Sequence, residues 1–433
     1  MKTRWSAPHL FIYVTAFLET LGAGLGAPVL PSLLEQITGK AVAQAGLSYG
    51  LLISIYAIAL VLTSKIVGRL SDAYGRRPVI LLALAGTAID YLVAANAQSV
   101  WVLLIARFIA GALGGTLVVC NAYLVDVTPP EQRAVRFGVL KGVLAAGMTL
   151  GPMLGGVLGA RDVRAPFWVA CAVAALGALY GALFLPESLK KEERRAFSLK
   201  GAYPFTIPRG SGVSVSFGVL ATLLLFEFGS TVAMPITVLY TQLRFGWTPG
   251  DLGVYLSIGG LLAIAGQAGL TRLLVPRLGE RAAVVLGLSV FVLTLGLTGL
   301  TQSAWQLYAI LPIAQFGFVG IPALMALISR YATSRAQGEL AGLLVAVSTG
   351  AQILSPLLGT WLFAEFSTRG GALFIPGLPY FVGAAIVAGS LLAAATSGLL
   401  TATPVAQEAV PTAIAQVPTA AQPTGHVEVQ AAE

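Results

Sequence analysis

GRLSDAYGRRP, from Gly68 to Pro78, is a short charged segment between two long apolar runs. Each run holds about 20 residues. A helix of that length can cross the ~30 Å hydrocarbon core of a bilayer. The segment therefore predicts a tight hydrophilic turn between two membrane helices, on the side where positive charge is retained. A generic basic loop would explain the arginines, but not Asp72 or the glycines. Gly68 and Gly75 permit a tight turn and a close approach of backbones.

The composition of the whole chain also predicts a membrane protein. Hydrophobic residues make up 57% of the 433 residues and charged residues only 10%, which is too little charge to cover a soluble protein of this size. We therefore expect an all-α membrane protein. Twelve apolar segments are long enough to cross the membrane: about 9–32, 47–67, 79–97, 101–124, 137–159, 164–185, 213–240, 251–275, 282–301, 304–329, 337–364 and 374–399.

The distribution of basic residues predicts how the chain is oriented. If both termini lie in the cytoplasm, most of the 26 Lys and Arg residues fall in cytoplasmic segments, as the positive-inside rule requires. We therefore expect a multi-pass protein of the bacterial cytoplasmic (inner) membrane. The same asymmetry accounts for the net charge of +8, so we expect the lipid bilayer, and no nucleic acid, as a partner.

The chain offers little for cofactor or metal chemistry. Cys120 and Cys171 both fall in expected helices, where buried thiols are typically packing residues. Neither zinc nor haem spacing is found, and no phosphate-binding loop is present. No set of nucleophile and base is evident either. We expect no metal, no cofactor other than the proton as coupling ion, and no enzyme activity.

The sequence repeats itself weakly at a shift of about 204 residues, which predicts a duplicated six-helix unit. The expected bundles are residues 1–185 and 213–400. A charged, proline-containing cytoplasmic linker, 186–212, joins them, and a disordered cytoplasmic tail, 401–433, follows. Four positions recur at this shift: Pro31 and Pro235, Gly75 and Gly279, Pro152 and Pro356, and Gly155 and Gly359.

Together with Gly68–Pro78, five further stretches resemble the drug/proton antiporters of the major facilitator superfamily, most nearly the tetracycline/proton antiporter branch. The likeness is close across residues 10–190 and weaker afterwards. It implies two pseudo-symmetric six-helix bundles, a small-molecule site between them and a monomer. The stretches are FLETLGAGLGAPVLPSLL (17–34), TAIDYL (87–92), RFIAGALGG (107–115), AYLVDVTPPEQRAVRFG (122–138) and GPMLGGVLG (151–159).

Four ionisable residues lie inside expected spans, namely Glu19, Asp90, Arg107 and Glu227. Such groups cost about 2.5–3.5 kcal/mol at the centre of a membrane helix and are candidates for function. The resemblance implies that Glu19, where the branch has aspartate, serves substrate or proton, and that Arg107 is linked to proton movement. Arg107 could pair with Asp90, which would be largely structural, or with Glu19. The alternative for Glu19 is a permanently paired structural carboxylate, and the alternative for Glu227 is a structural hydrogen bond to a neighbouring helix.

The resemblance also implies a gate on the cytoplasmic side. Asp72 would interact with the amino end of span 337–364, where the helix dipole is positive, and Arg76 would pair with Asp126 or its neighbourhood, joined by Arg133. Gly68 and Gly75 would shape the turn. The fifth span carries the small-residue pattern of antiporters, with a proline that bends the helix: Gly147, Gly151, Pro152, Gly155 and Gly156.

Polar and aromatic side chains of other spans could line a substrate cavity, although each taken singly is more often a packing residue. Aromatic rings suit flat or cationic ligands. The candidates are Asn121, Tyr123, Phe226, Phe228, Tyr240, Gln267, Gln315, Gln352 and Trp361.

We interpret the chain as a secondary active transporter that exports a lipophilic, cationic or zwitterionic drug or metabolite by proton antiport and alternating access, as in multidrug efflux and antibiotic resistance. Tetracycline is a doubtful cargo, because the acidic residue and the histidine that its exporters carry are absent from 282–301 and 251–275. Proton-coupled uptake of a sugar or another metabolite is the first alternative. A membrane receptor without transport is the second.

Overall fold

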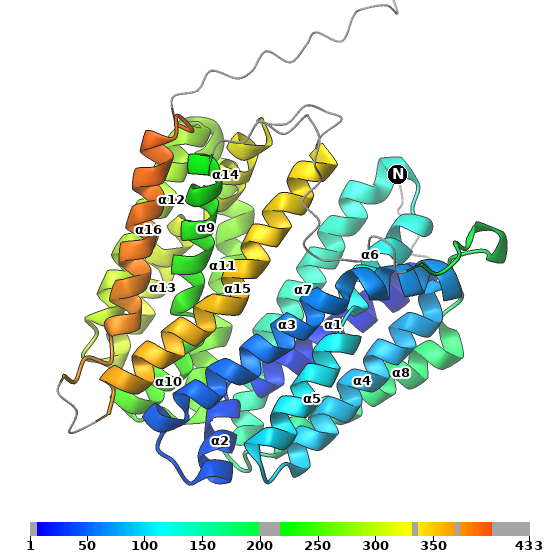
Figure 1. Ribbon diagram of the computed structural model, residues 1–433, viewed down its shortest axis with the longest axis horizontal. Helices are drawn as coiled ribbons and strands as arrows, with labels where there is room; N and C mark the ends of the chain where they lie inside the picture. The colour runs from blue at the N-terminus through cyan, green and yellow to red at the C-terminus, as the bar shows by residue number, and fades with distance from the viewer. Residues whose placement is uncertain (1–6, 199–216, 331–336, 369–372, 401–433) are drawn as a thin grey trace, which may run out of the picture.

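A computed structural model of the chain describes residues 7–198, 217–330, 337–368 and 373–400, and the regular elements in these ranges are helices (Figure 1). The N-terminal half holds α1 Ala7–Gly26, α2 Leu30–Thr38, α3 Val42–Tyr74, α4 Arg76–Asn96, α5 Val100–Leu113, α6 Thr116–Asp126, α7 Pro130–Gly159 and α8 Ala165–Phe184. The C-terminal half holds α9 Phe217–Val232, α10 Ile236–Phe245, α11 Pro249–Leu278, α12 Glu280–Gly299, α13 Ala304–Phe318, α14 Gly320–Ser329, α15 Gln337–Phe366 and α16 Leu378–Thr396.

The described residues contain twelve candidate membrane spans, three of which combine two of these helices, so the expected all-helical membrane fold is confirmed. The expected spans differ from the structure in one respect. The first and fourth spans of each half are interrupted, giving α1/α2, α5/α6, α9/α10 and α13/α14. The sequence shows these as continuous apolar runs, and continuous helices were expected.

The breaks occur where small residues or proline let the backbone leave the helix. Between α1 and α2, Pro28 lacks an N–H. The backbone N–H groups of Ala27 and Val29 donate to carbonyls three residues back, those of Gly24 and Gly26, in place of the α-helical hydrogen bonds. Between α5 and α6, the backbone of Gly114 lies outside the helical region. A Cβ atom at Gly115 would collide with Val67 of α3. The α5/α6 break lies within the span Val100–Asp126 and thus exposes backbone groups at a helix end inside the membrane region, whereas the α1/α2 break follows the end of the span Pro8–Gly26.

The internal repeat is visible in the geometry of matched positions. Gly75 and Gly279 end α3 and α11 with φ of 110° and 78°, a region that favours glycine. Pro152 and Pro356 both lie inside helices, α7 and α15. A Cβ atom at Gly155 would collide with the carbonyl of Leu25, and one at the matched Gly359 with the carbonyl of Val232. These equivalences indicate two related six-span bundles.

The two bundles share one apolar core and each has a core of its own. We name the end of the molecule that carries α2 and α10 the far end, and the end that carries the turns at Gly75 and Gly279 the basic end. The shared core lies at the far end and combines residues such as Leu33 and Phe167 with Leu239 and Phe363. The other two cores each belong to one half. Figure 1 accordingly shows the halves together at α2 and α10 and diverging towards the basic end.

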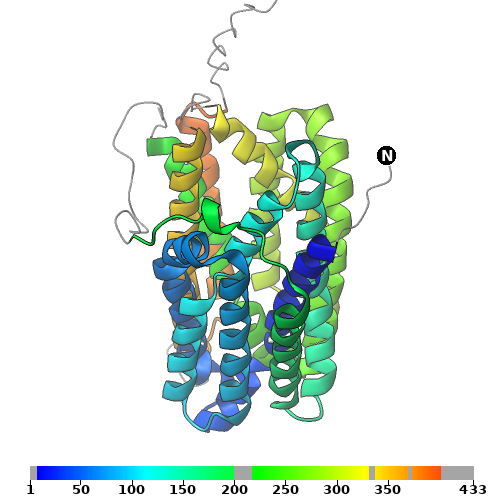
Figure 2. The same ribbon diagram turned by 90° about the vertical axis from the view of Figure 1, so that its right-hand side faces the viewer.

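Part of the expected linker belongs to the folded N-terminal half. Residues 186–198 cross the basic end of that half and include one turn of 3₁₀ helix, Lys191–Glu193 (Figure 2). The remainder of the expected linker 186–212 lies outside the described residues beyond residue 198, and the expected tail 401–433 lies wholly outside them.

Candidate functional site

Glu19 lies about 18 Å along α1, at 1.5 Å per residue, near the middle of the first span. Glu19 as a residue is half-buried, its Oε2 atom is fully buried, and its carboxyl group neighbours the side chain of Thr116, the first residue of α6. Because α6 begins inside the membrane region, its unpaired N–H groups and positive dipole end face an acidic side chain. Glu19 Oε2 nevertheless has no hydrogen-bond partner among the described residues.

Three further side chains of the N-terminal half surround this carboxyl group. Tyr56, Tyr91 and Cys120 are close enough to Glu19 for electrostatic interaction. Glycines make room for the two rings, since a Cβ atom at Gly22 would lie 3.2 Å from the Tyr91 ring and one at Gly114 would lie 3.1 Å from the Tyr56 hydroxyl. The sequence analysis did not predict a role for Thr116 or the two tyrosines. The signal that could have indicated the tyrosines is a tyrosine that lies opposite a glycine on a neighbouring helix.

Arg107 of α5 pairs with Asp90 of α4, and not with Glu19. Arg107 Nη1 lies 3.3 Å from Asp90 Oδ2, and the guanidinium also lies 6.0 Å from the centre of the Tyr91 ring. Asp90 is 4% exposed and the Arg107 side chain 19%, so each charge of this largely buried pair is neutralised by its partner. Of the two pairings left open by the sequence, this conformation contains Asp90–Arg107, and Glu19 forms no salt bridge with any residue that the structure describes.

Glu227 is the candidate carboxylate that the sequence placed inside a span of the C-terminal half. It lies in α9, is half-buried, and neighbours the Ser348 side chain of α15. Its backbone carbonyl accepts a hydrogen bond from Thr231, whose hydroxyl also contacts Ser355 of α15. Glu227 therefore lies on the side of α9 that packs towards α15.

The charged turn Gly68–Pro78 forms an ionic network at the basic end. The Arg76 guanidinium donates to Asp72, to Ser71 at 2.7 Å and to Asp126 Oδ2 at 3.1 Å. Ser188, at the start of the linker, donates to the same Asp126 oxygen at 3.0 Å. The network thus connects the end of α3, the start of α4 and the end of α6 with the linker.

Glu187 completes this network and was not expected from the sequence. Its carboxylate accepts from the backbone N–H groups of Arg76 at 2.8 Å and Arg77 at 3.3 Å. It therefore caps the amino end of α4, where a negative charge is favoured. A Cβ atom at Gly75 would collide with this carboxylate, and the backbone there has φ 110°. Gly75 is thus needed both for the turn and for the cap.

The other gating candidates lie around the same end. Arg133 donates to the carbonyls of Thr128 at 3.2 Å and Val125 at 3.3 Å, so it satisfies the carboxyl end of α6. Gly68 leaves space next to Val118 of α6. The contact expected between Asp72 and the amino end of span 337–364 stays a prediction, because residues 331–336 lie outside the described residues.

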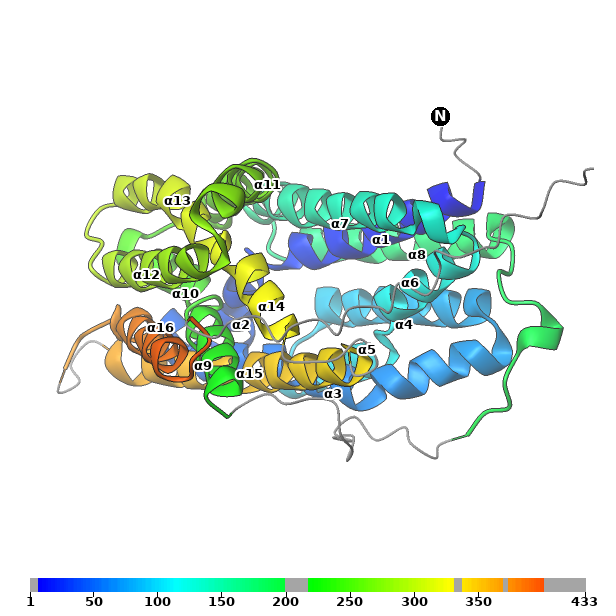
Figure 3. The same ribbon diagram turned by 90° about the horizontal axis from the view of Figure 1, so that it is seen from above.

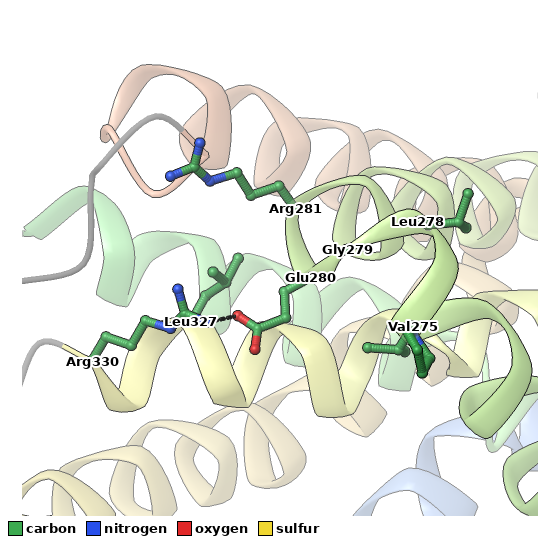
Figure 4. A pocket seen from close by; sticks show the side chains of 8 residues that line it. Val275, Leu278, Gly279, Glu280, Arg281, Leu327 and Arg330 are labelled. Carbon is green, nitrogen blue, oxygen red and sulfur yellow. Dashed lines mark hydrogen bonds and ion pairs between the residues drawn. The ribbon is translucent and has the colours of Figure 1, made fainter.

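The C-terminal half carries the counterpart of the Arg76–Asp126 pair with its charges exchanged. At the shift of about 204 residues, Arg76 corresponds to Glu280 and Asp126 to Arg330. Arg330 Nη2 lies 2.5 Å from Glu280 Oε2, so this pair also joins the start of the third span to the end of the fourth (Figure 4). It borders a pocket of about 580 Å³ that Val275, Leu278 and Leu327 also line.

The small-residue pattern of α7 serves two neighbours. Cβ atoms at Gly147, Gly151 and Gly155, which are spaced by four, would collide with the backbone or side chains of α1. Gly156 faces α11 of the other half, where a Cβ atom would lie 2.5 Å from the Pro249 carbonyl. The carbonyl of Pro152 approaches Gly253 of α11. The pattern therefore packs α7 both on its own half and across the interface.

The expected cavity residues separate into buried and exposed groups. Tyr123, Phe226 and Tyr240 are at most 4% exposed and pack inside helix cores, and Gln315 is 6% exposed. The Tyr123 hydroxyl donates to the Pro186 carbonyl and that of Tyr240 to the Thr301 carbonyl. These side chains are buried among packed helices in this conformation, and their place in a substrate cavity stays a prediction.

The remaining candidates are exposed or half-exposed within spans. Asn121, Gln267 and Gln352 are exposed, and Phe228 is half-buried. Trp361 is 50% exposed. Gly359 faces α9 and Thr360 faces α3. Because successive helical residues point in different directions, Trp361 lies on another side of α15. No group of three metal-ligating side chains occurs among the residues the structure describes.

Comparisons with known proteins agree with this architecture. Residues 12–321 match the family model of the Major Facilitator Superfamily. The chain is 33% identical over 379 residues to the tetracycline resistance protein, class C, of Escherichia coli, covering 87% of this chain and 93% of that protein. It is 28% identical over 354 residues to Multidrug resistance protein 2 of Bacillus subtilis (strain 168), covering 80% and 86%.

Solved structures share the fold at low sequence identity. The nucleoside transporter NupG superposes with a TM-score of 0.70 at 14% identity, covering 91% of this chain and 99% of that one. The human organic anion transporter MFSD10 (TETRAN) superposes with a TM-score of 0.63 at 24% identity, covering 89% and 98%.

Fold, span number and family match together define a membrane transporter, not an enzyme. The chain belongs to the major facilitator superfamily, and tetracycline resistance proteins are among its relatives, as the sequence resemblance indicated. Twelve apolar helices and bacterial efflux relatives indicate a multi-pass protein of the inner membrane.

Proposed function

We propose that this chain exports a lipophilic cationic or zwitterionic solute in exchange for protons, by alternating access. The observation that carries the proposal is the state of Glu19. Its carboxyl group is held inside the membrane region, has one oxygen without a hydrogen-bond partner, and forms no salt bridge among the described residues. Such a group can take up and release a proton without breaking a salt bridge.

The neighbouring charges support this assignment. Because Asp90 already balances Arg107, the guanidinium does not hold Glu19 permanently ionised by direct pairing. Glu227 places a second carboxylate in the other half, where a cationic cargo could contact it. If the basic end faces the cytoplasm, as the basic residues predict, the conformation described here is closed at the outer side and receives solute from the cytoplasm.

The cargo is inferred from the site and from the relatives. Proteins named for tetracycline resistance and multidrug resistance match most of the chain, which supports a drug-like solute. Two acids in membrane spans favour a positively charged group on it. The spans 251–275 and 282–301 contain no histidine and, after Asp251, no acidic residue. They therefore lack the acidic residue and the histidine that, by the resemblance described above, tetracycline exporters carry there. A cationic drug such as ethidium is thus the first cargo to test, with tetracycline beside it.

Transport in proteoliposomes with an acidic lumen tests the proposal. We expect the wild-type protein to accumulate ethidium or tetracycline and to release protons from the lumen in step, and nigericin to abolish both. Glu19→Gln should lose proton-driven accumulation of the solute. It should still exchange solute inside the vesicles for solute outside, because binding and conformational change do not require a titrating group. Glu131→Gln, at an exposed position of α7, is the matched control. Undiminished proton-driven accumulation by Glu19→Gln would remove that residue from coupling.

A further inference from the structure

The two halves meet along two seams on opposite sides of the molecule. In one seam α3 packs against α15, and in the other α7 packs against α11 (Figure 3). Both seams are lined by small residues, so that backbones approach closely, as in other membrane helix pairs. In each seam, one serine hydroxyl forms a hydrogen bond across the halves.

In the first seam the serine is Ser54 of α3. Its hydroxyl donates to the backbone carbonyl of Ile353 of α15 at 2.9 Å. One turn away, Gly50 faces Thr360, and a Cβ atom there would collide with the threonine side chain. Ser54 is 1% exposed, so its hydroxyl has no water to replace this bond.

In the second seam the serine is Ser257 of α11. Its hydroxyl donates to the backbone carbonyl of Thr149 of α7 at 2.7 Å. Gly253, one turn away, faces the carbonyl of Pro152. Ser257 is 6% exposed. The second seam therefore has the same parts as the first, with the two halves in exchanged roles.

The accepting carbonyls are equivalent in the internal repeat. Thr149 and Ile353 are separated by the repeat shift, and each lies three residues before a proline inside its helix, Pro152 or Pro356. A proline in a helix removes one backbone hydrogen bond and opens the preceding turn. A carbonyl in that turn has a lone pair and the space to accept a donor from a neighbouring helix.

Both bonds lie in the part of the seam that is closed in this conformation. Ser54 is twelve residues from the far-end start of α3, about 18 Å, and Ser257 is eight from the start of α11, about 12 Å. Between them and the far end lie the shared apolar core and the bond from Gln242 Nε2 to Glu35 Oε2, at 2.6 Å. Towards the basic end the cores belong to separate halves.

We propose that the Ser54 and Ser257 hydroxyls are a matched pair of latches that position the halves for transport: they hold the far end closed and must release when it opens. Removing one latch shifts the conformational equilibrium towards the form that is open at the far end. The inference depends on alternating access by this transporter family, and neither on proton coupling nor on the identity of the cargo.

Thiol accessibility in lipid nanodiscs tests the proposal. Cys120 and Cys171 are replaced by alanine, and the reporter Ala43→Cys is placed in α3 on the same face as Gly46 and Gly50, where the side chain is 5% exposed. We expect Ser54→Ala or Ser257→Ala to raise the rate of maleimide modification about fivefold, the effect of losing one buried hydrogen bond. The double variant should multiply the two increases, because the seams are far apart.

Ser390→Ala is the matched control. The Ser390 hydroxyl is also buried and also donates to a carbonyl of another helix, Thr222 at 2.7 Å, but both residues belong to the C-terminal half. It should leave the reporter rate unchanged. Ser54→Thr and Ser257→Thr retain the hydroxyl and should also label at the wild-type rate, which distinguishes loss of the bond from loosened packing.

Spin labels at two exposed far-end positions, Lys40 and Arg244, provide an independent readout if labelling of the reporter is limited by local motion. The alanine variants should increase the population at the longer distance. Unchanged rates and distances in both alanine variants would show that the hydroxyls do not latch the far end. An equal response to Ser390→Ala would assign the effect to general destabilisation and overturn the proposal as well.

Discussion

At the scale of single residues, the glycines of α7 show how little space separates the helices. Gly155 lies against the Leu25 carbonyl and Gly151 against Gly24. Neither contact involves a long side chain that could move aside, because the neighbouring atoms are backbone. Gly142 lies in the same helix with no atom within 4 Å of its missing Cβ. The two kinds of glycine should therefore respond oppositely to the same substitution.

We expect Gly155→Ala to lower the stability of the protein by about 1–3 kcal/mol, the usual cost of overpacking, because α1 and α7 must move apart. Gly142→Ala adds the same methyl group to the same helix and should cause no loss. Thermal unfolding in one detergent measures both. If the two variants unfolded at the same temperature, the close α1–α7 packing would not contribute to stability as described.

The residues of the candidate site divide by how visible they are in sequence. A charged residue inside a long apolar run is conspicuous in the sequence, so Glu19, Asp90 and Arg107 could be predicted as candidate site residues. Tyr56 and Tyr91 could not, because tyrosine is common in membrane helices and its role here depends on which helices pack together. Glu187 was missed because it lies in the linker, where a carboxylate has no evident partner until the turn at Gly75 is folded.

At the scale of elements, length and hydropathy were sufficient to predict twelve spans but not their four interruptions. A glycine in an apolar run is compatible with an unbroken membrane helix. Whether the helix breaks depends on its neighbours: Gly114 and Gly115 lie against Tyr56 and Val67 of α3. The interruption is consequential, since it creates the amino end of α6 next to Glu19.

The two exchanged ion pairs are also features of elements, because each fixes the start of one helix to the end of another. We expect Glu280→Arg or Arg330→Glu alone to destabilise α12 against α14 by placing like charges together, and the double exchange to recover most of the loss. Since both side chains are partly exposed, the recovered coupling should be about 0.2–1 kcal/mol. Thermal unfolding of the two single variants and the double variant measures it.

Arg277→Glu, an exposed substitution of the same charge change, controls for net charge in this experiment. It should differ from wild type by less than Arg330→Glu does. Strictly additive effects of Glu280→Arg and Arg330→Glu would mean that the two side chains do not stabilise each other in the membrane-embedded protein.

At the scale of the whole molecule, closure of the far end joins the halves through an acid outside the spans. Burial raises the pKa of Glu35 above its ordinary value of 4.5, partly opposed by hydrogen bonds from Gln242 and from the Val42 backbone. The closed form thus binds the proton more tightly than a form in which Glu35 is hydrated. Closure is strongest below pH 4.5 and weakens as pH rises through the raised pKa.

We expect the fraction of molecules open at the far end to increase as the pH is raised from about 4 to about 7, across the range in which a carboxyl group with a raised pKa ionises. Distances between spin labels at Lys40 and Arg244 measure this fraction. Glu35→Gln keeps the hydrogen-bonding shape without the charge and should remove this contribution. A pH response that is identical in Glu35→Gln would assign the titration to other groups.

The internal repeat relates the helix geometry of the two halves, but it does not relate their charged residues inside the spans. Turns, kinks and seams recur in both halves: the prolines of the two seams are equivalent at the repeat shift, and each seam also has one serine, at positions one residue away from equivalence. At the same shift, however, Glu19, Asp90 and Arg107 correspond to Leu223, Thr294 and Leu311, none of which carries a charge. The two halves are thus built alike as moving parts, whereas Glu19, Asp90 and Arg107 have no charged equivalent in the C-terminal half, and Glu227 corresponds to Ala23, which carries no charge either.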